Sequence, residues 1–268
     1  MSMIRPESFE YTPVGGAPYL QHTAFDKSPC NRNRLACIVR MIEACGQGPK
    51  NILEIGCGNG NIAIPIASLG HRVKAIDAHG PSIEIAKGRN RFPNLQFEHV
   101  PLEQVELKDF DVIVLTEVLE HVPRCGDMLG HISRGMRPGA RLILTVPNGW
   151  GIAEFLLRPS YALKRWPWGA RLVGGIKRIL AARDLTTSNE QTPHVHFFTL
   201  GRVARLLEEN DFSPIAFRRF FWAWALLETF LSQEKFPDKL PERDFHLSQH
   251  LPARMCALWA FLLEKKAG

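Results

Sequence analysis

One short run of residues limits the fold of this chain more than any other. Glycines at positions 56, 58 and 60 follow directly after the apolar segment 51–55 and precede a helical pattern over 61–69. Glycine lets the backbone approach a ligand closely, and the first turn of a helix offers N–H groups that lack intrahelical partners. A strand, a glycine-rich turn and a helix in this order predict a ligand site at the carboxyl edge of a parallel sheet.

The segments around this turn alternate between strand and helix patterns. In the run 111–115 every residue after Asp111 is apolar, which is typical of a central parallel strand covered on both faces. The predicted strands are 51–55, 72–76, 95–99, 111–115, 141–146, 215–221 and 255–263, and the predicted helices are 29–45, 61–69, 81–91, 124–136 and 200–209. This order predicts an α/β fold, a doubly wound sheet with right-handed crossovers.

The residues around the glycines restrict the ligand. The dinucleotide fingerprint G-x-G-x-x-G would need glycine at position 61, where this chain has asparagine. Glu54, two residues before Gly56, would repel a pyrophosphate but suits an ammonium group. Asp77 closes the second predicted strand, where an acid accepts hydrogen bonds from ribose hydroxyls. A cationic amino acid joined to a ribose describes S-adenosylmethionine (SAM).

Four segments resemble the class I SAM-dependent methyltransferases. They are ILEIGCGNG from Ile52, VKAID from Val73, DVIVLTEVLEHV from Asp111 and RPGARLILTVPN from Arg137. The resemblance is strong over 48–148 and moderate over 194–220 and 253–265. It implies a seven-stranded Rossmann-like sheet with helices on both faces, in which the last two strands form an antiparallel hairpin.

The resemblance also assigns cofactor residues. Glu54, Gly56, Gly58 and Gly60 are expected to hold the methionine end and Asp77 the ribose. Where the family often has an acid after the third strand, this chain has Val-Pro-Leu at 100–102, so we expect Leu102 to pack against adenine. Thr116 is expected beside the cofactor, where the acceptor also lies. The alternative is a Rossmann domain that binds NAD or has lost its cofactor.

Glu117, Glu120 and His121 follow the fourth predicted strand. In a helical turn they would share one face, and two carboxylates with an imidazole suit a hard cation such as Mg²⁺ or another divalent metal. The pattern resembles two metal-dependent subfamilies, the ubiquinone-biosynthesis O-methyltransferases and the small-RNA 3′-end 2′-O-methyltransferases. The RNA enzymes add a histidine five residues before a threonine, which makes His194 the candidate fourth ligand.

A reading without metal stays open for the same residues. Glu117 and His121 would then be the catalytic residues that line the acceptor pocket, as in many small-molecule methyltransferases. His194 and His196 would serve only to cap the helix that begins near residue 200.

We expect residues 1–28 to be an irregular lead-in and 29–268 to form a single domain with insertions at 149–192 and 222–252. Residues 150–183 hold seven Lys or Arg and one Glu, so this stretch alone carries the net charge of +6 of the whole chain. Cations beside tryptophans and an apolar stripe suit a surface of anionic lipid. The quinone O-methyltransferases carry a membrane-associating insertion at this point. The alternatives are a lid over the pocket and, less suited to its apolar residues, an RNA-binding element.

The second insertion is rich in aromatic residues over 220–230, which favours an apolar acceptor or a homodimer interface. The chain shows no secretory h-region, no long apolar span and no C-x-x-C pair, so we expect a cytoplasmic protein, with peripheral membrane association through 150–183. The sequence predicts a methyltransferase that acts on an oxygen of a hydrophobic, lipid-linked or glycan-type small acceptor. The alternatives are a metal-dependent RNA 2′-O-methyltransferase and a non-catalytic nucleotide-binding protein.

Overall fold

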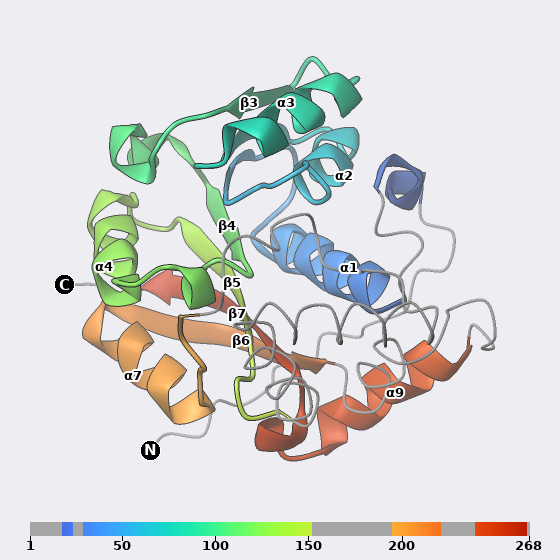
Figure 1. Cartoon of the computed structure of the whole chain (residues 1–268), viewed down its shortest axis with the longest axis vertical. Coiled ribbons are helices and arrows are strands. Elements are labelled where there is room, and N and C mark those ends of the chain that lie inside the picture. Colours follow the sequence, from blue (N-terminus) through green and yellow to red (C-terminus); the bar gives the residue numbers. More distant parts are fainter. Residues whose placement is uncertain (1–17, 24–28, 152–194, 221–238, 267–268) are drawn as a thin grey trace, which may run out of the picture.

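A computed structural model describes residues 18–23, 29–151, 195–220 and 239–266 (Figure 1). Its seven strands form one sheet in the order β3-β2-β1-β4-β5-β7-β6. The strands are β1 (Asn51–Ile55), β2 (Arg72–Ile76), β3 (Leu95–Glu98), β4 (Val112–Thr116), β5 (Arg141–Pro147), β6 (Phe212–Phe220) and β7 (Leu258–Lys265). The predicted seven-stranded sheet is therefore confirmed.

Strands β1 to β5 are parallel, and β7 runs antiparallel to both β5 and β6. The predicted antiparallel hairpin is confirmed, but its ends differ from the prediction. Strand β6 begins at Phe212 because an irregularity between Pro214 and Ala216 lets the ladder continue past the proline. Strand β7 begins at Leu258 because residues Ala253–Met255 form a 3-10 turn instead.

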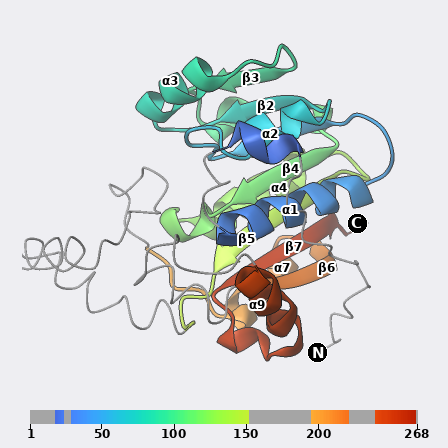
Figure 2. The ribbon, with the colours of Figure 1, turned by 90° about the vertical axis from the view of Figure 1, so that its right-hand side faces the viewer.

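Helices cover both faces of the sheet. In Figure 1 the sheet lies between α4 and α7 on the left and α1, α2 and α9 on the right, and Figure 2 shows α1 in front of the strands. The helices are α1 (Pro29–Ala44), α2 (Ala63–Ser68), α3 (Gly80–Arg89), α4 (Cys125–Gly135), α7 (Leu200–Glu209) and α9 (Lys239–His250). Two apolar clusters fill the two sides, one under α1, α2 and α3 and the other under α4 and α7. The predicted layers are thus confirmed.

Helix α9 lies within the second predicted insertion, where no helix was expected. It packs against β6 and α1. The guanidinium of Arg219, on β6, donates hydrogen bonds to the carbonyl oxygens of Gln249 and Leu251 at the end of this helix. A cation at a helix C-terminus satisfies carbonyls that have no intrahelical partner. Such a tertiary contact leaves no periodic signal in the sequence.

A short 3-10 helix, η1 (Pro18–His22), falls within the lead-in predicted to be irregular. Its Tyr19 and Leu20 side chains are buried, and it packs against α2. Most of the two predicted insertions, residues 152–194 and 221–238, lies outside the described residues. Of the helices that the structure describes, none combines the length and the hydropathy needed to cross a membrane.

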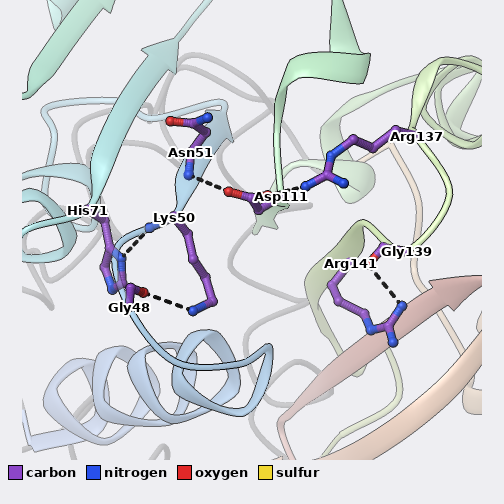
Figure 3. A network of polar contacts seen from close by, with 8 residues as sticks. All are labelled: Gly48, Lys50, Asn51, His71, Asp111, Arg137, Gly139 and Arg141. Carbon is purple, nitrogen blue, oxygen red and sulfur yellow. Dashed lines mark hydrogen bonds and ion pairs between the residues drawn. The ribbon is translucent and has the colours of Figure 1, made fainter.

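A polar network ties the strands together at the amino edge of the sheet (Figure 3). Asp111, just before β4, accepts a 2.7 Å hydrogen bond from the backbone N–H of Asn51 and forms an ion pair with Arg137. The ammonium of Lys50 donates to the carbonyl oxygens of Gly46 and Gly48, at 2.5 and 3.1 Å. These contacts fix the loops at the amino edge and leave the carboxyl edge as the place for a site.

Candidate functional site

The glycine turn joins the carboxyl end of β1 to the region of α2. All three glycines have positive φ values, 73° at Gly56, 51° at Gly58 and 77° at Gly60. A Cβ atom at Gly56 would overlap the Val118 side chain, and one at Gly60 would lie 2.7 Å from Cζ of Phe97. A Cβ at Gly58 would meet nothing within 4 Å in the part of the chain that the structure describes. Gly58 is therefore the point of the turn at which the backbone borders open space.

Asp77 binds the turn to the neighbouring strand. Its Oδ2 atom accepts a 2.7 Å hydrogen bond from the backbone N–H of Gly58, and Oδ1 accepts one of 2.8 Å from the N–H of His79. An ionised carboxylate has about four acceptor sites, so each oxygen can still accept a hydroxyl donor. The structure thus places Asp77 beside Gly58, and the ribose assignment stays a prediction.

Glu54 is almost completely buried on β1, with 1% of its surface exposed. It accepts a hydrogen bond from the backbone N–H of Ala63, while its Oε2 atom has no partner among the described residues. Burial, followed by the negative charge of Asp77, raises the pKa of Glu54 well above its usual value. A buried acceptor without a partner is costly, and a cationic donor would satisfy it.

Glu117 departs from the predicted geometry. Its φ of 54° is left-handed, so it does not continue into the 3-10 turn η5 (Leu119–His121). Its Oε1 atom accepts a 2.9 Å hydrogen bond from the hydroxyl of Thr145, and Oε2 lies 3.7 Å from a guanidinium nitrogen of Arg34. Although 30% of its side chain is exposed, burial is the main cause that raises its pKa, and the charge of Arg34 opposes this.

The prediction that Glu117, Glu120 and His121 share a helical face is therefore wrong. Because Glu117 takes a left-handed conformation, the three side chains are not spaced as in a helix. In the part of the chain that the structure describes, no three His, Cys, Asp or Glu side chains are placed to hold a metal ion. The guanidinium of Arg34 also already pairs with the negative charge of Glu117 that a metal ion would need. These residues do not fit the predicted metal site, and His194 lies outside the described residues.

The remaining predicted residues lie near the same edge. Thr116 is buried at the end of β4, in register with Thr145 of β5. His121 is partly exposed, and its Nε2 atom lies 3.9 Å from the buried carboxylate of Glu120. Leu102 opens the short 3-10 helix η3 (Leu102–Gln104) and is buried in the same apolar cluster as Ile76 of β2.

The stretch around His196 has a structural role. The ring of His196 contacts the carbonyl oxygen of Pro123 at 3.0 Å and the guanidinium of Arg202 at 3.1 Å. Thr199 is the N-cap of α7 and accepts a hydrogen bond from the N–H of Arg202. The threonine that suggested an RNA-enzyme motif is thus a helix cap, and His196 ties α7 to the loop after η5.

Sequence reasoning missed Arg34 and Thr145. Arg34 lies on α1, and its side chain is only 12% exposed. A signal was present, because Arg34 stands four residues before the buried Ile38 and so on the apolar side of its helix. Thr145 carried a weaker signal in the sequence, because a single threonine in a buried strand is usually a packing residue.

The fold and this edge together define a class. A parallel sheet that ends in an antiparallel hairpin, with a glycine turn after β1 and an acid after β2, is the arrangement of a Rossmann-like methyltransferase domain. The model of the family described as "Methyltransferase domain" matches residues 29–216, more than half of the chain. The chain therefore belongs to this methyltransferase family.

Similar proteins agree with this class. The ubiquinone biosynthesis O-methyltransferase of Schizosaccharomyces pombe is 37% identical over 113 residues, which cover 40% of this chain and 41% of the relative. The ubiquinone biosynthesis O-methyltransferase of Rhodopseudomonas palustris is 26% identical over 206 residues, 75% of this chain and 73% of the relative. The match to the yeast protein thus spans less than half of its length.

A solved structure shows the same fold. Magnesium protoporphyrin IX methyltransferase from Synechocystis, with bound SAH (S-adenosylhomocysteine), superposes with a TM-score of 0.56 at 14% identity. The match covers 91% of this chain and 89% of that protein. At this identity the likeness shows the fold alone.

Proposed function

We propose that this protein is a SAM-dependent methyltransferase that methylates an oxygen of a hydrophobic small acceptor. The observation that carries the proposal is the arrangement around Gly58. Glu54 is a buried carboxylate at the strand before the glycine turn, and its Oε2 atom has no partner among the described residues. Asp77, a second carboxylate, binds Gly58, where a Cβ would meet no described residue within 4 Å. One acid suits an ammonium group, and the other suits ribose hydroxyls.

The residues present fit the whole amino-acid end of SAM. Glu54 would receive the ammonium at its Oε2 atom, for which the described residues supply no partner. The positive charge of Arg34 acts on both Glu54 and Glu117, so a ligand carboxylate would find its cation there. Asp77 would hold the ribose, and Leu102, buried beside Ile76, would border the adenine.

When bound, SAM supplies a methyl group on a positively charged sulfur. The chain must then hold an acceptor hydroxyl in line and take its proton, and positioning alone can contribute about 7–11 kcal/mol. Glu117 is the candidate general base because it stands at the same edge and its pKa is raised towards the pH at which a base works best. His121, five residues past the end of β4, is the second titratable group near the acceptor. Among the described residues, no set of His, Cys, Asp or Glu side chains converges on a point where a metal ion could activate the acceptor.

Two observations support a hydrophobic acceptor. The relatives in yeast and in Rhodopseudomonas are named for ubiquinone biosynthesis. In addition, the sequence 220–230 concentrates aromatic residues next to β6, beyond what one strand can bury.

The proposal extends to the surface of a membrane. Trp150 is 58% exposed directly after β5, where the basic stretch 150–183 begins. An exposed tryptophan at the start of a stretch whose sequence holds seven Lys or Arg suits an interface with anionic lipid, where a hydrophobic acceptor would also reside. Cosedimentation with vesicles of neutral or anionic lipid tests this extension, and equal binding to both would contradict it.

A transfer assay tests the activity. Labelled SAM is incubated with a short-tailed catechol quinol, with the same quinol already methylated at oxygen, or with a single-stranded RNA, each with and without EDTA. We expect label on the free quinol only, without sensitivity to EDTA, and strongly reduced transfer in Glu117→Gln. Label on RNA alone, or a complete loss with EDTA, would overturn the proposal.

A further inference from the structure

Arg34 lies among carboxylates from two neighbouring strands. Its guanidinium is 3.7 Å from Oε2 of Glu117, just after β4, and its charge also acts on Glu54 of β1. The side chain comes from α1, which packs over this face of the sheet, and it is largely shielded from water. A shielded cation beside carboxylates has a strong influence, because screening by solvent is weak there.

Glu117 does not depend on Arg34 for its position. Its other oxygen, Oε1, is held by the hydroxyl of Thr145, a fully buried residue of β5. Its backbone is fixed as well, in a left-handed conformation that non-glycine residues adopt only when the surroundings require it. Glu117 can therefore lose the contact with Arg34 and still keep one hydrogen-bond partner and its place at the strand end.

We infer that Arg34 is shared between Glu117 and the carboxylate of the bound cofactor, so that cofactor binding frees Glu117 for the acceptor. This inference rests on the proposed function. Before the cofactor binds, Glu117 and Arg34 form an ion pair. The incoming carboxylate takes over the guanidinium, and Glu117, still held by Thr145, turns its Oε2 atom to the acceptor. Cofactor and acceptor therefore bind in that order.

The competition predicts the direction in which cofactor affinity changes when Glu117 is replaced, and this change can be measured without any acceptor. SAH carries the same amino-acid end as SAM, whereas 5′-methylthioadenosine lacks it and keeps the ribose and adenine. If Glu117 competes for Arg34, removal of its charge must strengthen the binding of SAH. The binding of methylthioadenosine must stay unchanged, because it has no carboxylate.

The experiment is calorimetric titration of both ligands into the full chain at pH 8. We expect Glu117→Gln to bind SAH about three- to tenfold more tightly and Arg34→Met about tenfold or more weakly, with methylthioadenosine unaffected in both. In Arg34→Met the further change Glu117→Gln should gain less than twofold, because nothing remains to compete for. Asp127→Asn, which removes an exposed acid on α4, is the matched control and should change neither ligand.

A second variant at position 117 separates the effect of the lost carboxylate from a folding defect. Glu117→Gly removes the carboxylate at a residue whose φ of 54° suits glycine, and it should strengthen SAH binding in the same way. Unchanged or weaker SAH binding in both Glu117 variants overturns the inference while the proposed function stands. A gain that persists in Arg34→Met also overturns it, because direct repulsion would then explain the effect. A wild-type protein that binds neither ligand overturns the inference and the proposed function together.

Discussion

The carboxylate of Asp77 accepts a 2.7 Å hydrogen bond from the backbone N–H of Gly58, and this bond joins the ends of two neighbouring strands into one site. The contact fixes the glycine turn from the β2 side. It also places an acid next to the position at which a Cβ would meet nothing. One residue thus shapes the turn and stands where a ribose would bind.

Replacement of Asp77 with alanine should weaken SAH binding tenfold or more, because the hydrogen bonds to both the turn and the ribose are lost. Asp77→Asn keeps one acceptor oxygen and should therefore lose less affinity for SAH than Asp77→Ala. Calorimetry measures both affinities, and the exposed Asp109→Ala serves as the control. An affinity that does not change in Asp77→Ala would remove the ribose assignment.

Gly58→Ala should abolish measurable SAH binding with only a modest loss of stability. A left-handed alanine costs about 1–2 kcal/mol, and its methyl group would enter the open space beside Asp77. Gly70, at the end of α2, has a φ of 89° and equally open surroundings, so Gly70→Ala carries similar strain without touching the site. Melting temperature and SAH affinity are measured for both variants. Equal SAH affinities would show that the space at Gly58 is not the cofactor site.

The free energy of unfolding should fall as the pH drops below about 6.5. Burial, and then the charge of Lys50, lower the pKa of His71, whose Nδ1 atom accepts a 3.2 Å hydrogen bond from the backbone N–H of Lys50 (Figure 3). The unfolded chain therefore binds the proton first on acidification. The contribution is complete above the unfolded pKa and declines towards the lower folded pKa.

Urea unfolding at pH 7.5, 6.5 and 5.5 measures this dependence. His71→Asn, whose amide oxygen can take the place of Nδ1, should flatten the curve over that window. The exposed His250→Asn should leave the curve as it is in the wild type. If the free energy of unfolding of His71→Asn depended on pH as steeply as that of the wild type, the dependence would belong to other groups.

Arg219→Ala should lower the free energy of unfolding by about 2 kcal/mol, because carbonyl oxygens at the end of α9 lose a charged donor. Urea unfolding gives the value, and Arg243→Ala, an exposed change on the same helix, is the control. Arg219→Lys should keep only part of this stabilisation, because lysine lacks the planar fork of the guanidinium. A loss no larger than that of the control would mean that Arg219 does not anchor α9.

Local patterns were sufficient for most of the fold. Alternating strand and helix patterns, with a continuous apolar run at 112–115, predicted the parallel part of the sheet and both covering layers. The same patterns failed at Glu117. The run Glu-Val-Leu-Glu-His at 117–121 was expected to form a helical turn, yet the backbone of Glu117 takes a left-handed conformation, and its side chain contacts β5 and α1 instead.

By itself the sequence determined the glycine turn, the acids before it and after β2, and the succession of strands and helices along the chain, because each depends on neighbours in the sequence. Only the tertiary structure decided the partners of Glu117, the place of Arg34 and the anchoring of α9. These contacts join residues that lie far apart in sequence, and a side chain carries no local mark of a partner that folding alone brings to it.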